Sequence, residues 1–220
     1  MPTHKIHLTI AKRINEKLNL DLDCVMLGSV LPDVGGQRKH SISHFQSGET
    51  DLEGLANPDV FVNKYKEQLS NPVMIGYLIH LLTDRFYNEY VFKNYYVYDK
   101  SNNGIGVILK GKKVTADNQE RKRYKHSDFF TYDAWLTNKG HAPKFKNNEC
   151  ISKIIPIEEI IVDENKLNEY IKSSNKDIDS VNIFSKFKIY NYKMLDQQTL
   201  DKMLDECISY IFDYLNKNVN

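Results

Sequence analysis

A histidine and an aspartate four residues apart, His80 and Asp84, are the clearest pair of chemically active side chains in the sequence. On a helix, both would project from one face and could reach a common ion. The spacing alone more often reflects a hydrogen bond within a helix than a metal site. Gly76, one turn earlier, is expected to leave room beneath the imidazole. Thr83 and Asn88 are expected to hydrogen-bond the ligands from outside.

A second candidate, His7, stands within the apolar stripe of the first predicted helix. A lone buried histidine is more often a hydrogen-bonded core residue than a ligand. His4 lies about one turn earlier and could take the same role. The residues alone therefore leave the choice between the two histidines open.

Asp33 follows Leu-Pro at the end of an apolar segment. A carboxylate so close to the core needs a cation or several hydrogen-bond donors, unless it is a cap or turn residue. His40 and His44 lie four residues apart in a segment that also suits a polar loop. One of these two histidines, together with Asp33, His7 and the pair on the central helix, makes a set of three histidines and two carboxylates. These ligand types suit zinc, iron or manganese.

The elements that must position these residues are mostly helical by their apolar periodicity. The first part of the chain is predicted to form a helix that is capped by Thr3 and ends at Leu18. An apolar segment from Val25 to Leu31 follows, which Pro32 stops, and then a loop at Gly35-Gly36. The second part is predicted to begin with a central helix from Pro72 to Phe92, capped by Asn71. A hairpin or irregular excursion is predicted from Tyr95 to Asp117. Three more helices are predicted, from after Ser127 to Asn138, from Pro156 to Ile171 and from Leu200 to Leu215. We expect one all-α metal-binding domain over residues 1–220, with a small insertion within 95–125.

Composition narrows the class of protein. Charged residues make up 27% of the chain and the formal net charge is +1, so the overall electrostatic field does not favour binding to a nucleic acid or an anionic membrane. No apolar run is long enough for a membrane span, and no signal-peptide core follows the N-terminus. The three cysteines are widely spaced, without a Cys-x-x-Cys pair. A reduced protein of the cytoplasm is therefore expected.

Four short blocks resemble the zinc-dependent phospholipase C family, which is related to the single-strand-specific zinc nucleases. They are I-H-L-T-I-A from Ile6 to Ala11, L-G-S-V-L-P-D from Leu27 to Asp33, S-H-F from Ser43 to Phe45, and G-Y-L-I-H-L-L-T-D from Gly76 to Asp84. The blocks keep the family's order and span about the first 90 residues. The last block is the most specific. The resemblance implies an all-α fold that holds a metal cluster.

By matching position, the resemblance implies metal-ligand roles for His7, Asp33, His44, His80 and Asp84. The family's first histidine stands four residues before an alanine, which selects His7 over His4. Asp84 matches the aspartate that commonly bridges two ions. Asp33 matches a ligand that also positions the attacking water, so it is the candidate catalytic residue.

The secreted phospholipases of that family carry a later His-x-x-x-Glu pair that completes a third metal. After Asp84 this chain has only His126 and His141, neither followed by glutamate four residues on. One or two ions, most consistent with zinc, are therefore expected. The sequence leaves open whether further side chains contribute. These are His4, His40, His126, Asp128 and His141.

The expected activity is hydrolysis of a phosphodiester or phosphomonoester by metal-activated water. The substrate would be a small phosphoester or a phospholipid, with nucleic acid less favoured. One alternative is a non-catalytic helical domain that a metal stabilises and that binds a ligand. A phosphohydrolase of the HD type is disfavoured because the chain has no adjacent His-Asp dipeptide.

Two further features have a functional and a structural reading. The basic run from Arg121 to Lys125 could bind phosphate, but a solvated loop is favoured. Tyrosines after the central helix could line a pocket, but core and rim positions are more common. These tyrosines are Tyr87, Tyr90, Tyr95, Tyr96 and Tyr98.

Overall fold

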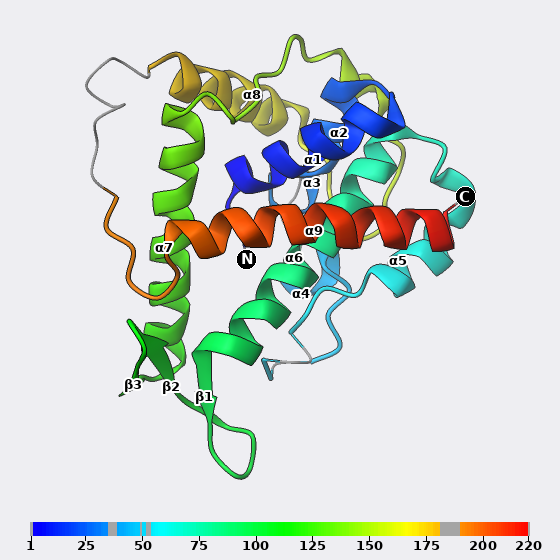
Figure 1. Cartoon of the computed structure of the whole chain (residues 1–220). Helices are drawn as coiled ribbons and strands as arrows, with labels where there is room; N and C mark the ends of the chain where they lie inside the picture. The colour runs from blue at the N-terminus through cyan, green and yellow to red at the C-terminus, as the bar shows by residue number, and fades with distance from the viewer. Residues whose placement is uncertain (1, 35–38, 49, 52–53, 181–189, 220) are drawn as a thin grey trace.

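The computed structural model describes residues 2–34, 39–48, 50–51, 54–180 and 190–219. The chain is mostly helical with one small antiparallel sheet, as predicted (Figure 1). No helix in the described ranges is long and apolar enough to cross a membrane. The three cysteines are free and buried. The predicted loop at Gly35-Gly36 lies outside the described residues.

The central helix is α6 (Pro72–Tyr95), which is buried on nearly every side. It begins as predicted, because the Asn71 side chain accepts a hydrogen bond from the Val73 N–H and Pro72 occupies the first turn. In Figure 1, α9 (Gln197–Asn218) runs across the front of α6. The stripe from Leu200 to Leu215 faces the core, which confirms the predicted last helix.

The N-terminal helix α1 (His4–Leu18) is confirmed, but its predicted cap is wrong. Thr3 occupies the N-cap position, yet its hydroxyl donates to the Phe129 carbonyl at 3.4 Å. The Asp133 carboxylate instead accepts the Ile6 N–H at 3.1 Å. A side chain from another helix therefore caps α1, and a local sequence rule does not include such a partner.

Helix α2 (Leu22–Gly28) crosses α6 where two glycines meet. A Cβ atom on Gly76 would lie 2.2 Å from the Val25 carbonyl oxygen, and one on Gly28 would lie 2.0 Å from the Val73 carbonyl oxygen. No side chain fits at either position, so the two backbones are in direct contact. The expectation that Gly76 makes room for an imidazole is wrong, because this glycine makes room for α2.

The short helix α3 (Leu31–Val34) contains Pro32, which was predicted to stop the preceding segment. Helix α2 has already ended at Gly28. Pro32 lies in the first turn of α3, where a missing N–H removes no helical hydrogen bond. The remaining elements of this half are α4 (His40–Ser43), α5 (Pro58–Tyr65) and the 3₁₀ helix η1 (Lys66–Gln68).

Helix α7 (Asn118–Asn138) begins nine residues before the predicted start after Ser127, and it ends where predicted. Asp117 and Glu120 form a capping box: the Asp117 side chain accepts the Glu120 N–H, and the Glu120 side chain accepts the Asp117 N–H. This signal is visible in the sequence. Its low apolar content masked the first half of the helix.

The predicted helix from Pro156 to Ile171 is wrong in its first half. The 3₁₀ helix η2 (Glu149–Lys153) is followed by irregular chain, and α8 (Glu164–Asp179) starts after Asp163. The Asp163 side chain accepts the Lys166 N–H and caps this helix.

The excursion after α6 is a three-stranded antiparallel sheet that projects from the helical body (Figure 1). Its strands are β1 (Tyr96–Tyr98), β2 (Gly104–Leu109) and β3 (Lys112–Thr115). The predicted hairpin is confirmed, and the third strand was not predicted. It returns through Lys110 and Gly111, whose φ angles of 49° and 78° fit a type I′ turn.

Candidate metal centre

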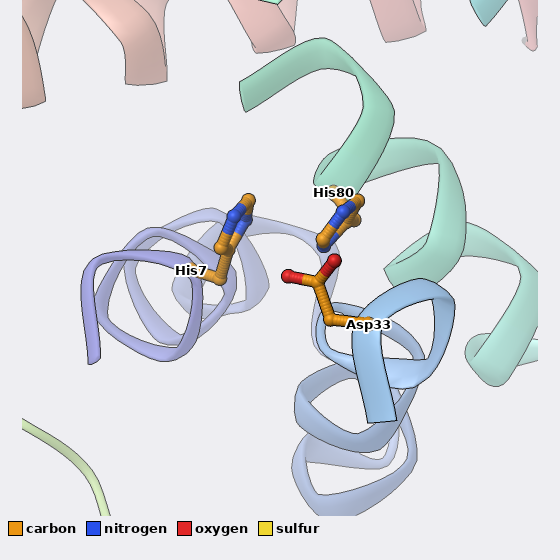
Figure 2. Close-up of side chains that lie close together, drawn as sticks. All are labelled: His7, Asp33 and His80. Atoms are coloured by element: carbon orange, nitrogen blue, oxygen red, sulfur yellow. The ribbon is translucent and has the colours of Figure 1, made fainter. Parts of the chain in front are cut away.

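The five predicted ligands come together at one place, although they come from four segments. His7 comes from α1, Asp33 from α3, His44 from the end of α4, and His80 and Asp84 from α6. His7, His44 and His80 have no exposed surface. Figure 2 shows the Asp33 carboxylate directed toward the imidazoles of His7 and His80.

The Nε2 atoms of His44 and His80 lie only 2.9 Å apart. The Nδ1 atom of His80 lies 2.8 Å from the Ser29 carbonyl oxygen, and that of His44 lies 3.0 Å from the His40 carbonyl oxygen. A carbonyl oxygen only accepts, so the Nδ1 of His80 carries the hydrogen in the neutral ring, and the Nε2 of His80 presents a lone pair to His44. The Nδ1 of His44 also lies 2.9 Å from the Ser43 hydroxyl, which can donate or accept, so both tautomers of His44 find a partner.

Carboxylate oxygens surround these two nitrogens, and none of them can donate a hydrogen bond when ionised. Asp84 Oδ2 lies 3.4 Å from His44 Nε2 and 3.9 Å from His80 Nε2. Burial lowers the pKa of His80 to about 3, so this imidazole is neutral at neutral pH and its Nε2 is an acceptor beside the carboxylates. A divalent cation would be bound by this lone pair and by the carboxylate oxygens together.

His7 and Asp84 carry the clearest unsatisfied atoms. His7 stacks on His80 with ring centroids 4.1 Å apart, and its Nε2 atom lies 3.3 Å from Asp84 Oδ1. Within the described residues, neither nitrogen of His7 nor Asp84 Oδ1 has a hydrogen bond of acceptable geometry. Leaving a buried polar atom unsatisfied costs about 1–3 kcal/mol. An ion at this position would satisfy Asp84 Oδ1 and one nitrogen of His7.

Asp33 lies at the mouth of the centre. Its side chain is 11% exposed, whereas that of Asp84 is 1% exposed, and its Oδ1 atom lies 3.6 Å from His44 Nε2. Burial raises the pKa of both carboxyls, but the facing imidazoles, above all His80, outweigh it and hold each pKa below its ordinary value. Both are therefore carboxylates at neutral pH and available as ligands.

Two histidines that the sequence left open also reach Asp33. His4 Nε2 lies 3.8 Å from Asp33 Oδ2, and His40 Nε2 lies 4.0 Å from Asp33 Oδ1. His40 also stacks on His44 at 3.6 Å between ring centroids. Both side chains are about two-fifths exposed, at 38% and 42%. They form an outer rim around a buried inner cluster.

Three overlapping groups of these side chains could each hold an ion, because within each group one ligand atom per residue lies within 4.8 Å of the others. The groups are His7, Asp33 and His80; Asp33, His40 and His44; and His44, His80 and Asp84. The donors are imidazole nitrogens and carboxylate oxygens without sulfur, a set that fits a divalent metal.

Asp128 and His141 lie in none of these groups. The Asp128 carboxylate accepts hydrogen bonds from the main-chain N–H groups of Lys193, Met194 and Leu195 at 2.7–2.8 Å. His141 stacks against Trp135. Asp128 thus anchors the chain before α9.

The outer hydrogen bonds predicted from Thr83 and Asn88 are wrong. The Thr83 hydroxyl donates to the Ile79 carbonyl, and the Asn88 side chain accepts from Lys125 Nζ at 2.6 Å. The groups beside the imidazole Nδ1 atoms are the Ser29 carbonyl for His80, and the His40 carbonyl and the Ser43 hydroxyl for His44. Main-chain partners carry no residue-type signal, whereas Ser43 lies inside one of the quoted blocks.

The basic run is helical rather than a solvated loop, and two of its members are buried. Arg121 pairs with Asp51 at 2.9 Å and lies over the Tyr96 ring. Lys125 is buried beneath Phe92. Only the remainder of the run is open to solvent.

A cleft of about 540 Å³ adjoins the centre, lined by the start of α1, α7 and α8. Asp33 and His4 belong to both the centre and this cleft, and His126 lies on the cleft wall. The aromatic walls are Phe130 and Tyr170. The tyrosines of α6 and β1 that were candidates for a pocket do not line this cleft, and Tyr87 and Tyr96 among them are core residues.

No known protein family, curated protein or solved structure matched this chain when it was compared with them. The resemblance to the zinc-dependent phospholipase C family therefore stays a prediction carried by the four blocks, and the site is argued from its own geometry.

Proposed function

We propose that this protein is a metal-dependent hydrolase of phosphate esters. The observation that carries the proposal is the convergence of the His44 and His80 Nε2 atoms on the buried carboxylate of Asp84, where Asp84 Oδ1 and both nitrogens of His7 have no hydrogen-bond partner among the described residues. Such an arrangement is unfavourable without a cation. The ligand types and the resemblance both favour zinc, with iron or manganese as the alternatives and one or two ions in the centre.

His44, His80 and Asp84 would hold an ion in the inner cluster, with His7 beside Asp84 and Asp33 at the mouth. When bound, a divalent cation acidifies water to a pKa of about 7 and neutralises charge on a phosphate ester. The hydrogen bond from Nδ1 of His80 to the Ser29 carbonyl fixes the tautomer that presents Nε2 to the ion, and the His40 carbonyl is placed to hold His44 in the same tautomer when the ion binds.

Asp33 is the residue to which we assign the catalytic step. Its carboxylate lies between the inner cluster and the cleft, so one oxygen can orient an attacking water and accept its proton. The cleft beside it would take the substrate. A small phosphodiester, phosphomonoester or phospholipid head group fits this proposal, and nucleic acid is less favoured. The three free buried thiols suit a reducing cytoplasm.

One observation favours a non-catalytic alternative, a helical ligand-binding domain stabilised by its metal. The inner ligands are almost completely buried, as in a closed structural site. The exposure of Asp33 to the cleft favours catalysis instead, because catalytic sites keep an open position.

Elemental analysis of metal per chain is the first test, on the wild type, on His80→Ala and on His141→Ala as a control outside the centre. We expect near-stoichiometric metal in the wild type and the control, and none in His80→Ala. A wild type that retains no metal after reconstitution would contradict the proposal.

The second test is hydrolysis of bis(p-nitrophenyl) phosphate and p-nitrophenyl phosphate by the metal-free and reloaded protein. Asp33→Asn should lose activity while it retains metal at His44, His80 and Asp84. A loaded but inactive wild type with either ester would favour the non-catalytic alternative.

A further inference from the structure

The projecting sheet concentrates positive charge in a chain that is almost neutral. Between Tyr96 and Thr115 there are four basic residues and one acidic residue, whereas the whole chain carries a net charge of +1. The rest of the molecule is therefore net negative. We call the segment from Tyr96 to Thr115, with its three strands and two turns, the basic sheet.

Four lysines of the basic sheet have no counter-charge among the described residues. Lys100, Lys110, Lys112 and Lys113 are exposed, and they make no ion pair with the described residues. Most of the nearby acids are engaged elsewhere. Asp99 accepts the N–H groups of its own turn, and the pair that caps α7 is held in its capping box.

Exposed aliphatic side chains lie among these lysines. Ile105 is 45% exposed and Val114 is 39% exposed. The two share the face of the buried Val107, because Val114 is opposite Val107 and Ile105 is two residues before it, so they lie at the exposed margin of that face. Lys112 projects from the same face as Val114, and Lys113 projects from the other.

Protection of a sheet edge explains only part of this pattern. Lysines on an edge strand prevent pairing with another chain, and Lys112 and Lys113 on β3 could serve that purpose. Lys100 and Lys110 lie in the turns, where they protect no strand edge. An exposed isoleucine also works against protection from association.

We propose that the basic sheet docks this protein onto an anionic lipid bilayer. Lysines beside a bilayer are attracted by anionic head groups, each strengthening association roughly fivefold. Ile105 and Val114 would enter the head-group region, as aliphatic side chains of interfacial segments do. Single-stranded nucleic acid is less well matched, because such sites combine basic grooves with exposed aromatic rings that stack on bases.

Sedimentation with vesicles tests the proposal, using phosphatidylcholine alone and an equal mixture of phosphatidylcholine and phosphatidylserine. The wild type should bind the mixed vesicles, release them at high salt, and ignore phosphatidylcholine alone. The variant K110Q/K112Q/K113Q should bind about a hundredfold more weakly. The control K139Q/K172Q/K176Q makes the same charge change away from the sheet and should bind like the wild type.

The variant I105S/V114S should bind mixed vesicles more weakly and keep its salt dependence, with circular dichroism confirming that it folds. Equal loss in the control triple variant, or equal binding to both kinds of vesicle, would overturn the proposal. So would binding to a single-stranded polynucleotide without binding to vesicles. Metal is not required, so binding should persist after chelation.

Discussion

Two buried aspartates, Asp84 on α6 and Asp128 on α7, have opposite kinds of hydrogen-bond partners. Asp128 accepts three main-chain N–H groups, and these hydrogen bonds oppose the burial that raises its pKa. Asp84 has one oxygen without an acceptable hydrogen bond, and imidazole nitrogens face it. The chain therefore satisfies one buried carboxylate itself and leaves the other to be satisfied by a ligand.

The comparison shows how to separate a structural buried acid from a functional one. Burial alone does not separate them, since both residues are almost inaccessible to solvent. Their hydrogen-bond partners separate them, because N–H donors satisfy a buried carboxylate, whereas a carboxylate surrounded by acceptors needs a cation.

The largest expected effect is on metal affinity, in His80→Ala. Loss of this nitrogen should lower affinity by more than about 100-fold, since even partners outside the ligand set alter affinity by 10–100-fold. Competition with a fluorescent chelator measures it. Affinity within a few-fold of wild type would show that the imidazole is a core residue.

The next largest effect is the difference in the free energy of unfolding between the variants Asp128→Asn and Asp84→Asn. Asp128→Asn should lower the free energy of unfolding by about 3 kcal/mol, because an amide nitrogen would face N–H donors. Asp84→Asn in the metal-free protein should stay within about 1 kcal/mol of wild type, and it should lose the metal. Urea unfolding with chelator measures both. A similar loss for the two variants would remove the distinction.

The pH dependence of stability should sharpen the comparison. In the metal-free protein, burial holds the pKa of His80 at about 3, below its ordinary 6.5, so the unfolded chain binds more protons between these values. The free energy of unfolding should therefore fall as pH falls through this window, by about 1.4 kcal/mol per unit at most.

Other groups modify this slope. His126, with a pKa lowered to about 4 by burial, acts in the same direction. Asp133, with a pKa raised to about 6 by burial, acts in the opposite direction between its ordinary value and about 6. Urea midpoints at about pH 7 and about pH 5 measure the net effect. Equal midpoints in the wild type would contradict the expectation.

The smallest expected effect belongs to the outer rim. His40→Gln should weaken metal binding by no more than about 10-fold, because this imidazole is exposed and lies 4.0 Å from Asp33 Oδ1. Titration of the metal-free protein measures it. A loss as large as that in His80→Ala would place His40 among the inner ligands.

The strongly periodic parts of the fold were predictable from the sequence. Helix α6 has a proline-marked start and α9 has a sustained apolar stripe, so both were found. The first half of α7 lacks such a stripe, and its capping box was missed. The cap of α1 comes from Asp133 on α7, and no local pattern could indicate a partner so distant in the chain.

The candidate site was predictable in its residue types but not in its shape. All five predicted side chains lie together, and the inclusion of His4 and His40 follows only from their approach to Asp33 in the folded chain. The orientation of His80 depends on the Ser29 carbonyl. Main-chain groups are present at every position, so the sequence cannot indicate which of them serves this purpose.

The contact between Gly28 and Gly76 has a consequence for how quickly and how selectively the centre takes up an ion. Ser29 follows Gly28 directly, and His80 stands one turn after Gly76, so this backbone contact fixes the Ser29 carbonyl against the His80 ring. The nitrogen is aimed before any ion arrives. Loading should then be limited by removal of water from the ion. A methyl group at Gly76 does not fit against α2, so it would displace the Ser29 carbonyl and change the orientation of the His80 ring.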